Sequence, residues 1–325
     1  YLFSCSDKFY ENLGILLDFV QSPYFTEKTV SKEQGIIAQE IKMYDDSPGW
    51  RAMFNMLKTM FKDHPVSIDI AGTVESIKEI DAGLLYKCYE TFYNPSNMFI
   101  CIAGNVDTNS VLKQIEEKIR PSLPSVIERG EFTDSKKVDK HFVSSRLSVC
   151  VPMFCIGFKQ SISSSFQSLK TKICVSLLLE IICGDSSPLY ARLVRDGLIN
   201  DEFSSEYFTG NGYAAMIFEG ESPDPKKVSE EIKGEINRIK NGGIDKKLFA
   251  AVKAATYGDC VRAFGSTEGI VMQLVNSAVC GYNAFDEIKY IKSVTAEDLM
   301  RVLNEFDVQN RVLSVIEPIE EVSEG

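Results

Sequence analysis

The sequence contains few histidines, a single tryptophan and no closely spaced cysteine pair. Its two histidines, His64 and His141, are far apart in the chain and lack the spacing of metal ligands on one helix. The nine cysteines follow no regular spacing and include no C-x-x-C pair, which is not the pattern of a disulfide framework. Unpaired cysteines are typical of a reducing compartment, so the composition predicts a cytoplasmic protein.

Two further absences restrict the possible partners of this chain. The 35 Lys and Arg residues are outnumbered by 46 Asp and Glu, and the formal net charge of -11 lacks the basic excess of nucleic-acid-binding proteins. No apolar run approaches the roughly 20 residues of a transmembrane helix. The longest candidate, residues 173–183, is interrupted by Ser176 and Glu180. We therefore expect no nucleic acid and no membrane among the partners of this chain.

The chain has the composition of an ordinary globular protein, with 325 residues, 44% of them hydrophobic and 25% charged. This length predicts about two domains. Residues 121–145 contain Pro121, Pro124 and mixed charges with little periodicity, so we predict a linker there. The predicted domains are therefore residues 1–120 and 146–325. Since the chain opens at Tyr1 directly in an apolar run without Met, we expect the first domain to lack its N-terminal portion.

The order of predicted elements repeats along the chain. Helical periodicity predicts helices in the first half, followed by a buried strand at residues 98–104. The second half begins with a strand at residues 146–158 and contains a hairpin around Gly210-Asn211-Gly212. It then repeats the order of helices and ends in a strand at residues 311–316. The predicted helices are residues 6–21, 31–46, 50–62, 81–93 and 111–119, and then residues 165–183, 187–196, 224–240, 245–263, 266–279 and 295–305. We predict an α+β fold of two homologous units, each a mostly antiparallel sheet packed against helices, with the first unit truncated.

Two carboxylates interrupt the apolar stripe of the helix at residues 31–46. Glu33 and Glu40 are seven residues apart, so they point the same way about two turns apart. Burial of a carboxylate is unfavourable unless a metal, a cation or a proton compensates its charge. Two interpretations follow: each carboxylate is paired with Lys or Arg or only half buried, or one of them is a metal ligand or a catalytic acid.

Several motifs resemble one known family. The segment Glu33-Gln-Gly-Ile-Ile-Ala-Gln-Glu40 is followed by His64-Pro65 and by Gly72-Thr-Val-Glu-Ser-Ile77. Further along come Asn94-Pro-Ser-Asn-Met98 and Gly104-Asn-Val-Asp107. These segments resemble the pitrilysin-type zinc peptidases, which include insulin-degrading enzyme and mitochondrial processing peptidase. The resemblance covers nearly the whole chain and is nearest to the small bacterial two-domain members.

The resemblance implies a zinc site that this chain does not complete. The family binds zinc through an inverted H-x-x-E-H helix and a glutamate on a later helix, whose position Glu40 occupies, while Glu33 matches a supporting glutamate. No H-x-x-E-H occurs in this sequence, so its general-base glutamate is absent as well. We expect the motif to precede Tyr1 in the parent protein, and the chain alone to hold no catalytic zinc and to be inactive. The alternative is a family member that never had the motif and acts as a peptide-binding or partner subunit.

Residues 186–198 resemble the family segment whose arginine reaches the substrate, and Arg195 takes that role here. Asn200 stands where the family often has a tyrosine, so Tyr207 is a weak substitute. The resemblance implies a peptide or small protein as substrate, bound in a cleft between the two units, and a homodimer or a heterodimer with a related subunit. Glu180 lies on the helix equivalent to the missing motif helix and is interpreted as structural. His64 is expected in a loop, and His141 in solvent.

Overall fold

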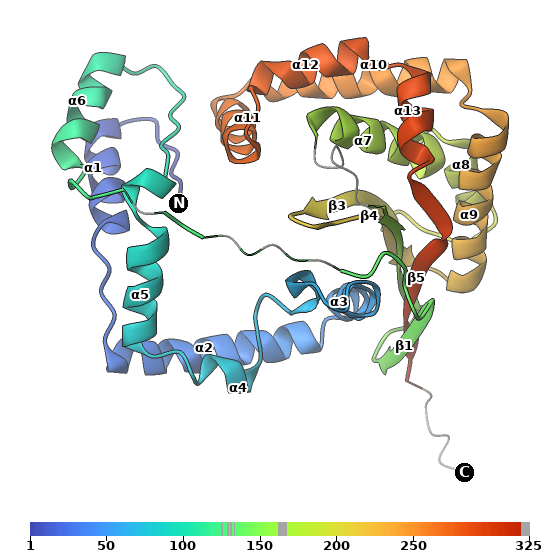
Figure 1. The fold of residues 1–325 in the computed structure, drawn as a ribbon, viewed down its shortest axis with the longest axis horizontal. Coiled ribbons are helices and arrows are strands. Elements are labelled where there is room, and N and C mark those ends of the chain that lie inside the picture. Colours follow the sequence, from blue (N-terminus) through green and yellow to red (C-terminus); the bar gives the residue numbers. More distant parts are fainter. Residues whose placement is uncertain (125, 129, 131, 133, 162–167, 320–325) are drawn as a thin grey trace. The chain divides into compact units, whose positions relative to one another are not determined.

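The computed structural model describes residues 1–124, 126–128, 130, 132, 134–161 and 168–319 (Figure 1). They form two compact units that are discontinuous in sequence, unlike the contiguous domains expected above. Unit 1 contains residues 1–41, 71–130 and 265–276, and unit 2 contains residues 42–70, 131–264 and 277–325. One passage of the chain between the units, at residues 130 and 131, falls inside the predicted linker at 121–145.

Unit 1 is helical in its described residues. Its elements are α1 (Phe9–Val20), most of α2 (Glu27–Asp45), α4 (Val74–Ile77), α5 (Ala82–Phe92), η2 (Pro95–Asn97), α6 (Thr108–Lys118) and most of α11 (Thr267–Cys280). A small core joins α1 to α6 through Leu13, Leu17 and Val111. The two helices approach closely because Gly14 has no side chain: a Cβ there would lie 3.2 Å from the Gln114 Nε2 atom. Unit 1 is therefore stabilised by helix packing.

The prediction of a buried strand at residues 98–104 is wrong. This segment is not part of any sheet, and its side chains Met98, Phe99 and Ile100 are 40%, 50% and 44% exposed. The apolar run at Tyr1–Phe3 forms no strand either. Apolar β-rich sequence adopts a strand only beside a neighbouring strand that pairs with its backbone. No described segment of unit 1 supplies that neighbour.

Unit 2 is built on one five-stranded sheet of order β1-β5-β2-β4-β3. The strands are β1 (Phe142–Leu147), β2 (Met153–Gln160), β3 (Ser204–Gly210), β4 (Tyr213–Glu221) and β5 (Phe306–Pro318). All neighbours are antiparallel except β1 and β5, which are parallel. The predicted hairpin is confirmed, since β3 and β4 pair up to Gly210 and Tyr213 and Gly212 has a φ of 84°. The predicted α+β class with a mostly antiparallel sheet is confirmed.

Helices cover both faces of this sheet (Figure 1). One face packs against α7 (Leu169–Cys183), eleven of whose fifteen residues are buried. Five further helices share the hydrophobic core of this face with α7. They are α8 (Pro188–Arg195), α9 (Pro225–Gly242), α10 (Lys246–Ala263), α12 (Ala284–Ser293) and α13 (Ala296–Leu303). The other face packs against α3 (Pro48–Met60), which is followed by η1 (Pro65–Ser67). Gly157 permits this contact, because a Cβ there would lie 2.5 Å from the Met60 Cε atom.

One helix of unit 2 was not predicted. Residues 284–293 form α12, which is capped by Asn283, whose side chain accepts a hydrogen bond from the Phe285 N–H group. Only Ala284 and Ile291 of this helix are buried, so few of its side chains are covered by the rest of unit 2. Short helices of this kind depend on tertiary packing, here against α10 and α7, more than on their own sequence.

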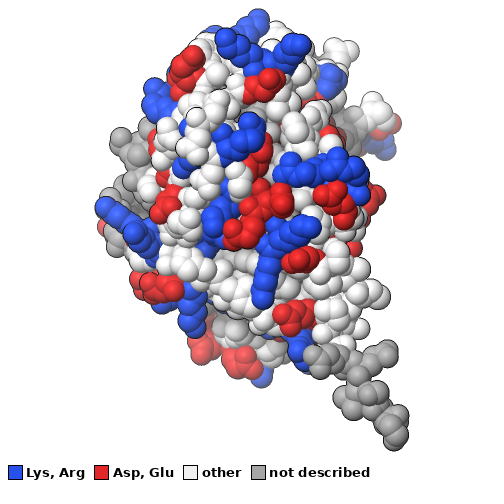
Figure 2. Space-filling model, turned by 90° about the vertical axis from the view of Figure 1, so that its right-hand side faces the viewer, with Lys and Arg blue, Asp and Glu red and all other residues white. Residues whose placement is uncertain are grey.

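The helical face of Figure 2 carries both signs of charge, with Lys and Arg interspersed among Asp and Glu. Several of these charges are paired on α8, α9 and α13, for example Arg192 with Glu231 and Arg238 with Glu235. No single helix in the described part of the chain is long and apolar enough to span a membrane; α7 and α8, bent by 41°, meet the length and composition requirement only as a pair.

Candidate functional site

Helix α2 presents Glu33 and Glu40 to solvent, although the apolar stripe of the sequence places both in its middle. The helix packs instead through Val30 and Ile41, which are its buried residues. On the same side, the Gln34 side-chain amide donates hydrogen bonds to the carbonyl groups of Ile77 and Ile80, at 3.1 and 3.0 Å. Apolar periodicity overestimated the covered face, because Ile36 and Met43 are themselves 48% and 61% exposed. Both carboxylates are therefore accessible from outside unit 1.

The described residues do not fit a catalytic zinc ion by themselves. Such an ion takes three protein ligands and an open position for water. Among the residues with described positions, no group of three His, Cys, Asp or Glu side chains converges. Glu40 therefore offers a single carboxylate, and the remaining ligands would have to come from other residues.

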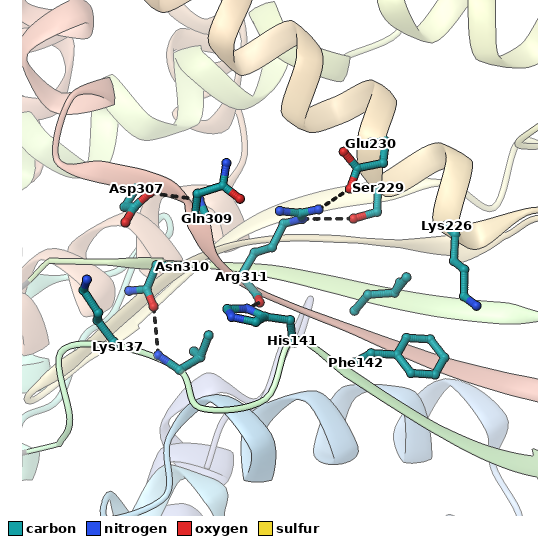
Figure 3. Close-up of a pocket in the computed structure, with 12 residues that line it drawn as sticks. Lys137, His141, Phe142, Lys226, Ser229, Glu230, Asp307, Gln309, Asn310 and Arg311 are labelled. Atoms are coloured by element: carbon teal, nitrogen blue, oxygen red, sulfur yellow. Dashed lines mark hydrogen bonds and ion pairs between the residues drawn. The ribbon is translucent and has the colours of Figure 1, made fainter.

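His141 lies in solvent, as expected, at a groove of unit 2 (Figure 3). Its Nδ1 atom is 2.9 Å from the carbonyl oxygen of Arg311. His141 belongs to no group of three His, Cys, Asp or Glu side chains in the described residues that could hold a metal ion.

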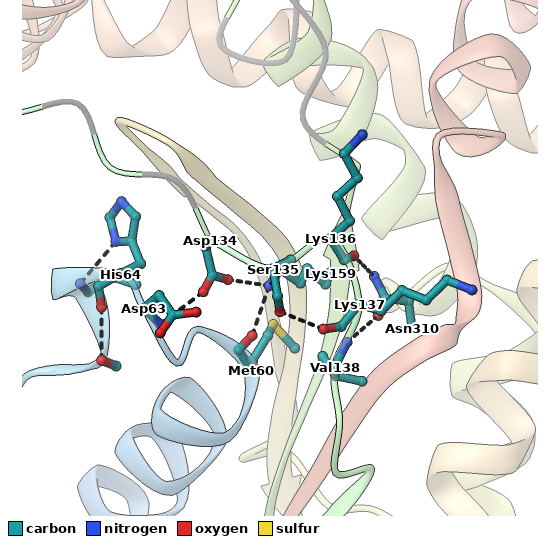
Figure 4. A network of polar contacts seen from close by, with 12 residues as sticks. Met60, Asp63, His64, Asp134, Ser135, Lys136, Lys137, Val138, Lys159 and Asn310 are labelled. Atoms are coloured by element: carbon teal, nitrogen blue, oxygen red, sulfur yellow. Dashed lines mark hydrogen bonds and ion pairs between the residues drawn. The ribbon is translucent and has the colours of Figure 1, made fainter.

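His64 is in a loop, as expected, but it is buried (Figure 4). Its Nδ1 atom accepts a hydrogen bond from the Val66 N–H group at 3.1 Å, so Nε2 carries the proton and donates to the carbonyl oxygen of Asn211 at 2.8 Å. Both ring nitrogens are occupied by the backbone. His64 thus connects the end of α3 to the β3–β4 turn and is not available as a ligand or base.

Arg195 is the last residue of α8, and its side chain is 71% exposed. Its Nε atom lies 3.1 Å from the carboxylate of Asp196, its neighbour in sequence. Ser187 begins the helix by accepting a hydrogen bond from Tyr190 N–H, and Arg192 joins the helix to α9 through Glu231 at 2.7 Å. Helix α8 therefore has an anchored arginine and an exposed one. The role of Arg195 in substrate binding stays a prediction.

Tyr207 lies on β3 and packs against the core beneath α7. Its hydroxyl donates a hydrogen bond to the side-chain oxygen of Gln160, whose amide in turn donates to Glu305 at 2.8 Å. Burial raises the pKa of Tyr207 to about 12, so the hydroxyl keeps its proton and remains a donor. These contacts are those of a core residue, and the predicted part of Tyr207 in peptide binding stays a prediction.

The buried thiols of the core are not activated as nucleophiles. All nine cysteines are free, and those of the core are held as neutral thiols because burial raises the pKa of Cys174 to about 11 and of Cys183 to about 12. Thiol nucleophiles need a lowered pKa instead.

The cytoplasmic location stays a prediction.

A buried ion pair was not anticipated from the sequence. The Lys159 ammonium group and the Asp134 carboxylate are in contact, with side chains that are 5% and 3% exposed (Figure 4). Lys159 also donates to the carbonyl oxygens of Met60 and Ser135, at 2.9 and 2.6 Å. The one signal was a lysine placed at the end of the apolar strand sequence Met-Phe-Cys-Ile-Gly-Phe that precedes it. The pair ties α3, the segment after residue 133 and β2 together.

Two family descriptions match the chain. The model described as insulinase (peptidase family M16) matches residues 1–74, and the peptidase M16 inactive domain matches residues 79–256. A relative from Bacillus subtilis, the uncharacterized zinc protease YmfH, is 38% identical over 311 residues, which are 94% of this chain and 72% of the relative. Another from the same organism, named "Probable inactive metalloprotease YmfF", is 21% identical over 90% of this chain and 70% of its own length.

Solved structures agree with these matches. An M16-like peptidase from Alicyclobacillus acidocaldarius superposes with a TM-score of 0.91 at 31% identity, covering 96% of this chain and 76% of that one. A protease from Helicobacter pylori superposes with a TM-score of 0.82 at 18% identity, covering 95% of this chain and 76% of that one, which shows the shared fold alone.

Proposed function

Because the chain belongs to the peptidase M16 family, we propose that it is part of a zinc-dependent peptidase to which Glu40 contributes one zinc ligand. The observation that carries this proposal is the exposure of the Glu40 side chain on α2, within the residues matched by the insulinase model. An exposed carboxylate can be reached by a metal ion and by ligands from other residues. Glu33 lies about 10 Å away along the same helix, at a rise of about 1.5 Å per residue, and would support the site from a distance.

Hydrolysis is not assigned to this chain alone. Zinc, when bound in such peptidases, activates the water that attacks the peptide bond. The described residues provide too few ligands for that ion, so we expect the chain as given to be inactive. Its contribution would be to bind a peptide or small protein, with Arg195 as the cation that meets the peptide. Pairing as a homodimer or with a related subunit stays a prediction.

Two observations favour a second candidate function, a non-catalytic partner subunit. The family description that matches the larger part of the chain is an inactive domain, and one relative carries the word inactive in its name. A chain of this kind would bind peptide and associate with an active subunit without holding zinc.

The experiment compares this chain with the full-length product of its gene. Zinc content by atomic emission and cleavage of a fluorogenic peptide are measured for both proteins, and for the full-length variants Glu40→Gln and Glu33→Gln. We expect about one zinc per full-length chain, lost together with activity in Glu40→Gln, and none in this chain. Glu33→Gln is the matched control on the same helix face, and we expect it to keep zinc.

A full-length protein without zinc would exclude the peptidase and leave the partner subunit. A Glu40→Gln variant that keeps both zinc and activity would remove Glu40 from the site.

A further inference from the structure

Lys172 and Cys280 are in contact at the surface of unit 2, in a place that the function proposed above does not use. The Lys172 ammonium group donates to the Cys280 sulfur atom at 3.5 Å, although the two residues are 108 positions apart in sequence. Cys280 is the last residue of α11, and Lys172 lies in the first turn of α7. Both residues belong to unit 2, so the contact lies within one compact unit.

The Cys280 thiol is accessible, and its backbone is held in place. Cys280 is exposed, unlike the cysteines of the unit 2 core. Helix α11 ends behind it in a glycine turn, in which Gly281 has a φ of 74° and the Tyr282 N–H group donates to the Ser277 carbonyl at 3.0 Å. An oxidant can therefore reach a sulfur atom whose position is restrained.

The lysine distinguishes this cysteine from others at the surface. In the described part of the chain, three further exposed cysteines accept no hydrogen bond from a lysine: Cys5, Cys88 and Cys150. Lys172 has no carboxylate partner among the described side chains, whereas Lys170 pairs with Asp298 at 2.8 Å. The first turn of a helix also disfavours a cation, because its free N–H groups carry partial positive charge. Loss of the Lys172 charge would therefore cost little at this position.

The two side chains have the groups needed for a covalent bond. Hydrogen peroxide oxidises an exposed thiol to a sulfenic acid, as the sulfur gains one oxygen atom and the rest of the peroxide leaves as water. A sulfenic acid then condenses with a nearby nitrogen nucleophile. A lysine ammonium group would first release a proton to solvent, and its amine would then form an S–N bond while the sulfenic oxygen leaves as water. Thiols reduce the resulting sulfenamide back to a free thiol and a free amine.

We propose that Cys280 and Lys172 form a redox-sensitive crosslinking site, at which peroxide joins the end of α11 to the first turn of α7. Residues 265–276, which include most of α11, belong to unit 1, whereas residues 277–280 belong to unit 2. The crosslink would therefore fix the point at which α11 enters unit 2. This site uses neither Glu40 nor zinc and is independent of the function proposed above.

The experiment treats the full 325-residue chain with hydrogen peroxide, blocks free thiols with iodoacetamide and digests the protein with trypsin in the absence of reductant. Trypsin cleaves after Lys172 only when its amine is free, so the crosslink leaves residues 171–192 uncleaved and joined to residues 263–289. Mass spectrometry should find this joined peptide, lighter than the sum of its parts by two hydrogen atoms. Dithiothreitol added before digestion should abolish it and restore cleavage after Lys172. Hydrogen exchange of residues 277–281 should slow after oxidation, because the crosslink restrains the end of α11.

Matched variants test each partner. Lys172→Arg keeps a cation beside the thiol but removes the primary amine, so the joined peptide should be lost, and dimedone, which captures sulfenic acids, should label Cys280 instead. Lys170→Arg, in the same helical turn, should keep the joined peptide. Cys280→Ser should abolish it, whereas Cys150→Ser, at another exposed cysteine, should not. Glu40→Gln should leave the crosslink unchanged, which separates this site from the peptidase proposal.

Two results would overturn the proposal. Cys260 is a competing partner, because burial raises the pKa of Tyr282 and the acidic groups around it, which include the thiols of Cys280 and Cys260, raise it further. A disulfide between these cysteines would appear as residues 263–289 joined to residues 254–262, with Lys172 still cleaved. The second result is oxidation of Cys280 to the sulfinic acid, equally in the parent chain and in Lys172→Arg, which would show that the lysine does not capture the sulfenic acid.

Discussion

Lys159 and Asp134 form an ion pair inside unit 2, with less than a tenth of either side chain exposed. The pair is embedded in further hydrogen bonds, since the Asp63 N–H group donates to the Asp134 carboxylate at 3.0 Å and Lys159 lies over the ring of Phe61. The segment that follows is fixed as well: Asn310 accepts from the Val138 N–H group and donates to the Lys136 carbonyl, both at 2.9 Å. The chain therefore enters unit 2 through an anchored segment.

Lys159→Met should destabilise unit 2 by roughly 3 kcal/mol, because it leaves the Asp134 carboxylate buried without its cation. The free energy of unfolding is measured by urea titration. Lys62→Met is the matched control, since Lys62 pairs with Asp139 at the surface, where the side chains are 49% and 63% exposed. Loss of such a surface pair should change stability by less than about 1 kcal/mol. Equal losses in the two variants would contradict a structural role for the buried pair.

Gly212→Ala should be more destabilising than Gly281→Ala, although both glycines have positive φ angles, 84° and 74°. A Cβ at Gly212 would lie 2.9 Å from the Phe132 carbonyl oxygen and 3.2 Å from the His64 Nε2 atom, whereas a Cβ at Gly281 would have no atom within 4 Å. Both variants place a Cβ at a positive φ, and only Gly212→Ala adds the contact at the turn, which we expect to cost roughly 1 kcal/mol. Thermal unfolding followed by circular dichroism measures this difference. Equal shifts in melting temperature for the two variants would contradict the predicted steric contact at Gly212.

Two acidic residues of unit 2, Glu287 and Asp298, should affect stability at neutral pH with opposite signs. Burial raises the pKa of Glu287 on α12, so its carboxylate opposes folding once pH rises above the unfolded pKa. Lys170 and the start of α13 lower the pKa of Asp298, whose contribution is present at neutral pH and lost as pH falls through the folded pKa. Glu287→Gln should therefore raise stability at pH 7 and have little effect at pH 4. Asp298→Asn should lower it at pH 7 by about 1 kcal/mol.

The free energy of unfolding of both variants, measured by urea titration at pH 4 and pH 7, tests these two opposite effects. A Glu287→Gln variant that is less stable than the parent chain at pH 7 would show that the carboxylate has a stabilising partner.

Elements specified by neighbouring residues were predictable from the sequence. Helix α9, predicted at residues 224–240, is bounded by Asp224 and Gly243, because the Asp224 side chain accepts from the Lys227 N–H group and Gly243 adopts a conformation that other residues avoid. The hairpin at Gly210-Asn211-Gly212 follows from the same kind of local chemistry. The family motifs, which are also local, identified the family correctly.

Features that depend on distant partners were not predictable. Residues 98–104 have the composition of a strand but lack a neighbouring strand in the described part of unit 1. The apolar stripe of α2 indicated a face and not what covers it, so it did not predict that Glu33 and Glu40 are exposed. The buried position of Lys159 depends on Asp134, which is 25 residues away in sequence and in a stretch with no periodicity. Periodicity assigns a residue to a face, and only packing decides its partner.

Tyr207→Phe separates the two roles considered for that residue. Its hydroxyl donates to Gln160, which is 1% exposed and itself donates to Glu305, so the variant leaves a buried acceptor without its donor. We expect a loss of about 1–2 kcal/mol in the free energy of unfolding. A peptide-binding role predicts a raised KM for peptide cleavage by the full-length protein with unchanged stability, as we expect for Arg195→Ala, whose side chain is exposed. If Tyr207→Phe unfolds like the parent chain and only KM rises, Tyr207 contacts the peptide, and its hydrogen bond to Gln160 contributes little to the core.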